Sequence, residues 1–117
     1  MSDVELVMMC RDRLKDMRRR TEEIDLLKRS RAQLPEAGAY LDETIQAAEG
    51  TLRSLRKEFP VLVARAMDVL QRLPRKERRV LMLYYVTGLS LKEVSNEVHY
   101  STRHVQKIKQ AGLNKLR

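Results

Sequence analysis

The fold is decided by residues 88–117, which read GLSLKEVSNEVHYSTRHVQKIKQAGLNKLR. Ser90 and Glu93 have the spacing of a capping box, in which a hydroxyl and a carboxylate bond the first free N–H groups of a helix. Gly88, just before them, suits the end of a preceding helix because glycine accepts the left-handed conformation there. Residues 99–101 are the right length for a tight turn, and the turn ends on a serine that can cap a second helix. The stretch therefore predicts a helix-turn-helix.

The two helices of this motif each have an apolar face. In the first helix it is formed by Leu91, Val94 and Val98. In the second, Val105, Ile108 and Leu116 are predicted to face inward, with Leu113 near the edge of the same stripe. The opposite face of the second helix carries, in its first turns, Thr102, Arg103, Gln106 and Lys107. A short capped helix, a tight turn and a longer basic helix can place such side chains in a DNA major groove.

The positive charge of the chain is concentrated on the same part. The chain has 117 residues and a formal net charge of +8. Residues 75–117 hold 10 Lys and Arg against three Asp and Glu, whereas residues 1–74 hold 14 against 13. A phosphate-binding surface requires such segregation, while a basic surface that serves only solubility does not predict it. The expected partner is therefore a nucleic acid.

Composition limits the other classes of function. Aromatic residues make up 4% of the chain and charged residues 34%, which favours long helices with a modest core. The single cysteine, Cys10, allows no intrachain disulfide, and no apolar run or signal-peptide pattern indicates a membrane or export, so we expect a cytoplasmic protein. His99 and His104 lack companions for a metal site. With no phosphate loop or acid/base constellation, we expect no enzyme, no cofactor and no metal.

The first 73 residues predict two long helices. A capping-box spacing at Ser2 and Glu5 begins the first, and an apolar seam follows it at heptad spacing: Val7, Cys10, Leu14, Met17, Thr21 and Ile24. The second helix carries an apolar seam that includes Leu41, Ile45, Leu52, Leu55, Phe59 and Leu62. The register of this seam passes through Pro60 unchanged, so a kink near residue 60 is favoured over a break.

The short connection at residues 34–39 makes these helices antiparallel neighbours, that is, a helical hairpin. An isolated hairpin buries little apolar area, so its seam needs cover from the C-terminal helices or from a second copy of the chain. Leu73-Pro74 marks a boundary, after which residues 75–87 form another helix. The predicted architecture is all-α: a coiled-coil-like helical hairpin over residues 1–73, followed by a compact three-helix helix-turn-helix unit over residues 74–117.

Residues 73–117 resemble region 4 of the sigma-70 family of bacterial transcription initiation factors. The residues that carry the resemblance are LPRKERRVLMLYYVTGLSLKEV, the turn HYS and the ending AGLNKLR. The ending YSTRHVQKIKQAGLNKL, together with a preceding helical hairpin, is more similar to a group of small region-4-like proteins of bacteriophages and prophages. The resemblance implies a DNA-binding regulator of transcription, plausible targets being phage or prophage genes.

By position, the resemblance makes Thr102, Arg103, Gln106 and Lys107 the residues that read bases. It implies phosphate contacts at the capped helix starts, namely Ser90, Leu91, Lys92, Ser101 and His104. The chain has Thr102-Arg103 and Gln106-Lys107 where sigma factors of the −35 element have Arg-Glu and Arg-Gln. An arginine suited to guanine therefore replaces a carboxylate suited to cytosine, and a different recognition sequence is expected.

Three classes of function follow from these residues. The first is a sequence-specific regulator that binds double-stranded DNA, with the hairpin as a homodimerisation or polymerase-contact arm. The second is a sigma-like cofactor that binds RNA polymerase through protein contacts alone. The third is an RNA-binding accessory protein. Residues 1–74 contain only Tyr40 and Phe59 as aromatic residues, so a promoter-melting domain is not expected.

Overall fold

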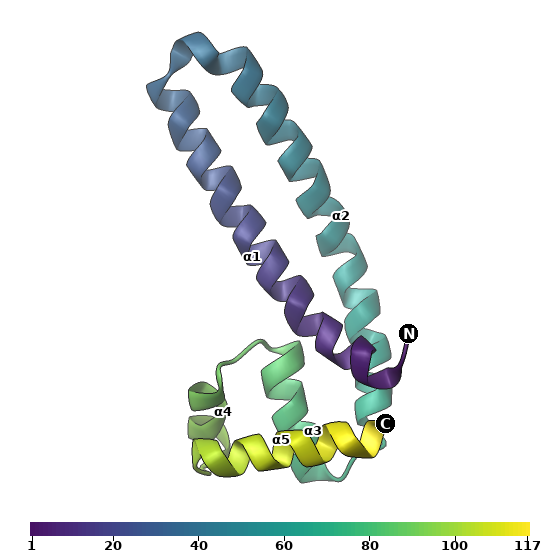
Figure 1. Ribbon diagram of the computed structural model, residues 1–117. Coiled ribbons are helices and arrows are strands. Elements are labelled where there is room, and N and C mark those ends of the chain that lie inside the picture. Colours follow the sequence, from purple (N-terminus) through teal and green to yellow (C-terminus); the bar gives the residue numbers. More distant parts are fainter. The chain divides into compact units, whose positions relative to one another are not determined.

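The computed structural model describes all 117 residues and contains helices and turns only (Figure 1). The elements in chain order are α1 (Asp3–Gln33), the 3₁₀ helix η1 (Pro35–Ala37), α2 (Gly38–Leu70), α3 (Arg75–Leu81), the π-helical segment η2 (Met82–Val86), α4 (Leu91–Val98) and α5 (Thr102–Leu116). The predicted all-α fold is confirmed: α1 and α2 are a long antiparallel pair, and a compact three-helix unit follows them. None of the helices combines the length and apolar character that crossing a membrane would require.

By packing, the chain divides into two compact units. The first, here called the helix-turn-helix unit, comprises Met1–Asp12 and Pro60–Arg117. The second, here called the hairpin unit, comprises Arg13–Phe59. The division therefore cuts α1 after its first turns and α2 immediately before Pro60. The domain boundary at residues 73/74 follows the helix ends and stays a prediction.

The hairpin unit consists of parts of α1 and α2 joined through η1. Ion pairs connect the two helices, with Lys28 Nζ 3.0 Å from a carboxylate oxygen of Glu49, and Arg31 pairing with Asp42 nearer the connection. Ile24, Ile45 and Leu52 are the buried apolar residues of this unit. The seam residues Leu41, Leu55 and Phe59 are half-buried. The apolar contact in this unit is therefore thin.

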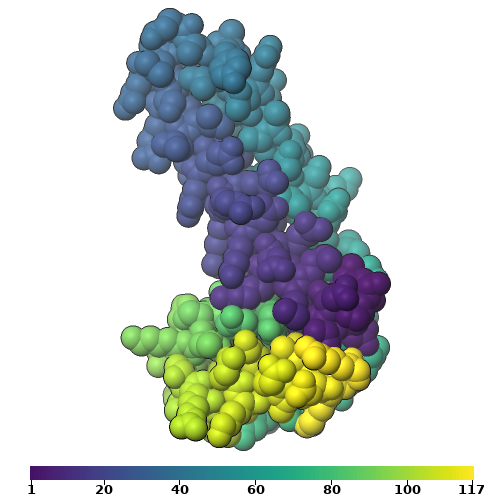
Figure 2. All heavy atoms as spheres, viewed as in Figure 1, coloured from purple at the N-terminus to yellow at the C-terminus, as the bar shows by residue number.

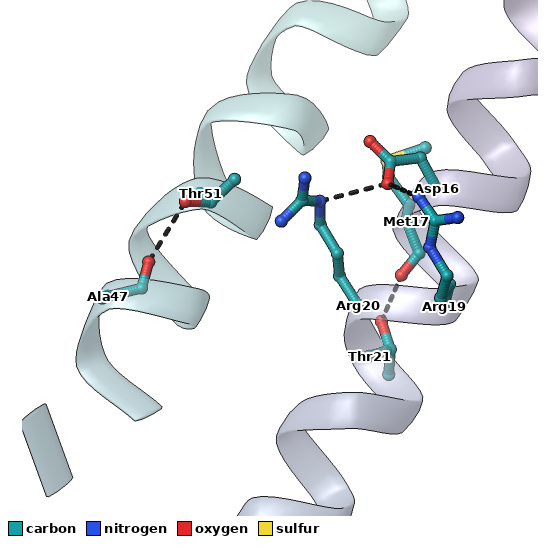
Figure 3. A network of polar contacts seen from close by, with 7 residues as sticks. All are labelled: Asp16, Met17, Arg19, Arg20, Thr21, Ala47 and Thr51. Atoms are coloured by element: carbon teal, nitrogen blue, oxygen red, sulfur yellow. Dashed lines mark hydrogen bonds and ion pairs between the residues drawn. The ribbon is translucent and has the colours of Figure 1, made fainter. Parts of the chain in front are cut away.

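Polar contacts in the hairpin unit run mostly along single helices (Figure 3). The carboxylate of Asp16 accepts hydrogen bonds from Arg19 at 2.8 Å and from Arg20 at 3.2 Å. The bond from Arg19 is the main cause that lowers the pKa of Asp16. Two threonine hydroxyls bond the carbonyl one turn back, Thr21 to Met17 and Thr51 to Ala47. The cations at positions 19 and 20 are thus engaged locally, as on a solvated helix face.

The helix α2 continues through Pro60 without a break. Pro60 is exposed, and Leu62, the next seam residue, is half-buried. The expectation that the apolar register passes the proline is met, because seam positions on both sides of it remain covered. The proline coincides with the division between the two units.

The core of the helix-turn-helix unit is formed where α3, α4 and α5 meet. Its buried cluster is Val80, Val94, Val105 and Ile108, and half-buried apolar residues pack against it: Leu83, Tyr84, Leu89, Leu91 and Val98. One prediction for α5 is wrong. Leu113 is buried with 5% of its surface exposed, while Leu116 is only half-buried.

Gly112, next to Leu113, lies at a close contact between α5 and α3. A Cβ atom there would lie 3.0 Å from Leu81 Cδ1 and 3.2 Å from Glu77 Cβ. Without one, α3 and α5 approach closely at this turn. Helical periodicity alone did not register this, because a glycine adds nothing to an apolar stripe.

The helix predicted over residues 75–87 changes from an α-helix to a π-helix partway along. It is α-helical to Leu81 and then widens into the π-helical η2, where Thr87 N–H donates to the Met82 carbonyl at 2.9 Å. As predicted, Gly88 ends it: its φ of 80° lies in the left-handed region. The reversal brings Leu89 N–H to the Leu83 carbonyl at 3.0 Å. This turn delivers the chain to the start of α4.

The first turns of α1 belong to the helix-turn-helix unit, which the sequence did not predict. The apolar residues buried there are Val4, Leu6, Val7 and Cys10. Ser2 Oγ accepts from Glu5 N–H at 3.1 Å and caps the helix as predicted, and Asp3 pairs with Arg72 in the turn after α2. Burial raises the pKa of the Cys10 thiol, in keeping with its predicted use as a small apolar residue.

Candidate nucleic-acid interface

The helix-turn-helix is held by two serine caps and one left-handed residue. Ser90 Oγ accepts from Glu93 N–H at 3.1 Å, and Glu93 Oε1 accepts from Ser90 N–H at 3.0 Å, which completes the capping box. His99 ends α4 with a φ of 61°, and Ser101 Oγ then accepts from His104 N–H at 3.1 Å to begin α5. Ser95 Oγ also donates to the Tyr100 carbonyl within the turn. Both predicted caps and the predicted turn are confirmed.

The packing of α5 against α3 and α4 determines which face of α5 looks outward. Val105 and Ile108 are buried against α3 and α4. The outer face is exposed at all four residues predicted to read bases: Thr102, Arg103, Gln106 and Lys107. Positions 102, 103, 106 and 107 share one side of a helix with 3.6 residues per turn. Figure 2 shows the side chains of α5, in green to yellow, at the surface of the molecule.

The two helix starts differ as sites for an anion. The first turn of α5 contains no acidic residue, so its free N–H groups and the positive end of its dipole face solvent beside Ser101 and His104, both exposed. The first turn of α4 contains Glu93, whose carboxylate already accepts from Ser90 N–H. The side chain of Lys92 is exposed there and can contact an anion. The side chain of Leu91 packs against the core, so only the backbone N–H of Leu91 can contact an anion.

A basic groove beside the turn was not predicted from the sequence. It is a cavity of about 260 Å³ lined by Arg75, Lys76, Arg79, Val80, Val98 and Tyr100. Lys76 Nζ lies 4.8 Å from the centre of the Tyr100 ring, and this ring makes an edge contact with His104, at 4.8 Å between centroids. The groove therefore lies between α3 and the turn that precedes α5. The run RKERR at 75–79 was the available signal.

A chain of aromatic and cationic contacts lies on the inner side of α5. Lys109 Nζ is 4.6 Å from the centre of the Tyr84 ring, and Tyr84 makes an edge contact with Tyr85 at 4.8 Å. Burial is the main cause that raises the pKa of Tyr85. Tyr84 is half-buried and Tyr85 is buried, so the two tyrosines are not an exposed platform. No group of three or more His, Cys, Asp or Glu side chains lies together in a way that could hold a metal.

Comparison with known proteins identifies this part of the chain. Residues 69–117 match the family model described as Sigma-70, region 4. No curated protein and no solved structure gives a significant match. The matched segment covers α3 to α5 with the last residues of α2, so the capped helix-turn-helix described above is a sigma-70 region 4 domain preceded by a long helical hairpin. Region 4 is a DNA-binding, non-enzymatic family, and the match implies DNA binding by this domain.

Proposed function

We propose that this protein is a sequence-specific regulator of transcription that binds double-stranded DNA, acts on phage or prophage genes and reads the major groove with α5. The observation that carries the proposal is the exposed face of Thr102, Arg103, Gln106 and Lys107, presented by a doubly capped turn within a region 4 domain. The segregated positive charge supports a phosphate-bearing partner. The similarity of the C-terminal ending to small phage and prophage proteins supports the choice of target genes.

The four exposed side chains have distinct base-reading chemistry. Arg103 can donate two hydrogen bonds to O6 and N7 of a guanine, and Gln106 can pair with N6 and N7 of an adenine. Thr102 offers a methyl group for the thymine methyl and a hydroxyl for either base type. Lys107 adds a flexible donor for guanine or a phosphate. No carboxylate lies among these four, so selection for cytosine through its amino group is not expected from this face.

Phosphate contacts flank this face in the proposal. The start of α5 is the better anion site, because Ser101 and His104 stand beside a helix end without an acidic residue. Ser90, the Leu91 backbone and Lys92 form a second, weaker contact next to Glu93. We add Lys76 of the basic groove as a third phosphate contact. Its Nζ lies over the Tyr100 ring, and that ring contacts His104 at the start of α5.

Selection of bound sites from a random pool of DNA duplexes tests the proposal directly. The wild-type protein should enrich one motif, with affinity that falls steeply as salt rises. Arg103→Ala should lose about 1–3 kcal/mol at one base position of that motif and relax the preference there. Arg18→Ala, the same change at an exposed position of the hairpin unit, is the matched control and should leave the motif intact. If Arg103→Ala weakened all duplexes equally, Arg103 would be a phosphate contact instead.

We also propose that two copies of the chain pair through the hairpin seam. The support is that Leu41, Leu55 and Phe59 remain half-buried in a unit with few buried apolar residues. Leu55→Asp places a charge in this seam, so the variant should sediment as a monomer while the wild type sediments as a dimer. Gln46→Asp, at an exposed position of the same helix, is the control. A wild-type monomer at the concentrations of the DNA experiments would contradict the pairing.

RNA polymerase is the second candidate partner, because the region 4 match concerns a family of transcription factors. A pull-down of polymerase that survives Arg103→Ala and Lys107→Ala, together with failure to enrich any DNA motif, would favour this function over DNA reading. Tighter binding to structured RNA than to any duplex would favour an RNA-binding accessory protein.

A further inference from the structure

Arg11, on the first turns of α1, reaches into the helix-turn-helix unit. Its Nη1 donates to the carbonyl oxygens of Tyr84, at 2.7 Å, and Leu89, at 2.8 Å. Its Cζ lies 3.9 Å from the centre of the Tyr84 ring. One guanidinium therefore makes three contacts with a segment more than 70 residues away in the chain, and all of them lie within one compact unit.

The two carbonyls that Arg11 bonds lie on either side of the chain reversal before α4. Tyr84 belongs to η2, and Leu89 immediately precedes Ser90, the N-cap of α4. The last carbonyls of a helix lack intrahelical partners, and a cation there is also favoured by the helix dipole. By bonding both oxygens with one nitrogen, Arg11 fixes the separation between the end of η2 and the beginning of α4.

The same guanidinium is linked to α5 through an aromatic ring. Tyr84 accepts the cation of Arg11 at 3.9 Å and that of Lys109 at 4.6 Å. Lys109 follows Gln106 and Lys107 by less than one turn of α5. The Tyr84 ring is thus a contact shared by α1 and the helix proposed to read DNA.

If position 11 served only to fill space in the core, an apolar residue would be sufficient there. The neighbouring positions of this face, Val7 and Cys10, are both fully buried and apolar. Arg11 instead brings a charge whose Nε is buried without a hydrogen-bond partner. Burying such a group is costly, and an apolar replacement is often neutral or stabilising. A directional group at this position is therefore best explained by the geometry that it imposes.

From these contacts we infer that Arg11 is a positioning residue for DNA recognition. It holds the η2–α4 connection and, through Tyr84, sets the orientation of α5 without touching DNA itself. The role in DNA recognition rests on the proposed function, whereas the contacts of Arg11 do not. Arg11 lies outside residues 69–117, so the matched domain does not contain this part of its own support.

The experiment compares Arg11→Met, Arg11→Lys and Arg18→Met in the full-length chain. Met fills similar apolar space without donors, Lys keeps the charge without the planar group, and Arg18 is exposed in the hairpin unit. For each variant, the Tm is measured, and the ratio of affinities for the selected DNA site and a random duplex is then determined well below the lowest Tm. Amide NMR spectra without DNA report residues 84–90 and 102–109.

Arg11→Met should stay folded and lose roughly tenfold in the affinity ratio, as found for residues that act on a site without touching its ligand. Arg11→Lys should lose less, because it retains one donor and the cation above Tyr84. Both should shift the amide signals of both segments, while Arg18→Met changes neither measurement. If Arg11→Met does not fold, Arg11→Lys carries both measurements.

Either of two results overturns the inference: an unchanged affinity ratio in a folded Arg11 variant, or α5 signals that do not move. A lower Tm with an unchanged ratio would mean that Arg11 only stabilises the fold. If the wild type prefers no duplex, the proposed function fails, and the amide signals then decide the positioning role by themselves.

Discussion

The two units of the chain are both helical but are stabilised in different ways. The hairpin unit, Arg13–Phe59, buries only Ile24, Ile45 and Leu52 among its apolar residues. The helix-turn-helix unit buries all the others, including Val80, Val94 and Val105 at 1% exposure or less. The hairpin instead shows ion pairs and hydrogen bonds at exposed positions. Exposed ion pairs contribute little to stability, so the same side-chain change should have unequal effects in the two units.

The difference also bears on the proposed pairing of two copies through the hairpin seam. The helix-turn-helix unit draws on two segments of the chain, because the first turns of α1 belong to the same compact unit as residues 60–117. The half-buried seam of the hairpin, by contrast, is the kind of surface that a second copy could cover. Each prediction below therefore pairs one change in the helix-turn-helix unit with a similar change in the hairpin unit.

The largest difference is expected for truncation of leucine. Leu81 is fully buried, and Leu81→Ala should lower the free energy of unfolding by about 2–5 kcal/mol. Leu55 is half-buried, so Leu55→Ala removes less buried area and should cost clearly less, about 1 kcal/mol. Urea unfolding followed by circular dichroism measures both, at a protein concentration where the wild type is monomeric. Equal losses would show that the hairpin is packed as tightly as the region 4 domain.

Glycine substitution should have opposite signs in the two units. Gly112→Ala puts a methyl group 3.0 Å from Leu81 Cδ1, and overpacking of this kind costs about 1–3 kcal/mol. Nothing lies within 4 Å of a Cβ placed at Gly50, so Gly50→Ala should stabilise α2 by about 0.5–1 kcal/mol through helix propensity. Thermal unfolding of the two variants tests the pair. A stabilised Gly112→Ala would mean that Leu81 moves aside without cost.

The caps, turn and seams could be predicted from sequence because each depends on neighbouring residues. Ser90 with Glu93 and Ser101 with His104 are local contacts, and the seams repeat at fixed spacing. What could not be predicted depends on contacts between distant segments. Arg11 with Tyr84 spans 73 residues, and no spacing rule relates them. The close approach of α3 and α5 at Gly112 likewise joins segments that are distant in the chain.

The candidate site likewise has a part that the sequence predicted and a part that it did not. The outer face of α5 followed from helical periodicity and from the resemblance to region 4, and all four of its predicted residues are exposed. The groove with Lys76 and Tyr100 required knowledge of how α3 packs beside the turn. The cations at 75–79 were visible in the sequence, but their direction was not.

Removal of a side-chain hydroxyl should change the free energy of unfolding of the two units by amounts that differ less. Ser90→Ala loses the hydroxyl that bonds Glu93 N–H and leaves the capping box incomplete, which costs about 1 kcal/mol. Thr51→Ala loses a bond to the carbonyl of Ala47 within α2, and it should be neutral or slightly stabilising because alanine is the better helix former. Urea unfolding measures both variants. A neutral Ser90→Ala would show that Glu93 alone is a sufficient cap.

The smallest effect concerns the ion pair between α3 and α5. Lys115 Nζ lies 2.6 Å from Glu77 Oε1, and this hydrogen bond is the main cause that holds the pKa of Glu77 below its usual value of 4.5. Because the folded pKa is the lower one, the pair contributes stability above the unfolded pKa, and the contribution is lost as the pH falls through the folded pKa. Lys115 is half exposed, with 50% of its side chain accessible, so the contribution should stay below about 1 kcal/mol.

Glu77→Gln should therefore lower the free energy of unfolding at pH 7 and have little effect at a pH below the folded pKa of Glu77, as measured by urea unfolding at each pH. Asp42→Asn is the counterpart in the hairpin unit, where Arg31 likewise lowers the pKa of Asp42 but both side chains are nearly half exposed. Its pH dependence should be flatter than that of Glu77→Gln, because water and salt screen an exposed pair more than a partly covered one. Equal pH dependence in the two variants would mean that the partial cover over Glu77 adds nothing, and that the two units differ in apolar packing alone.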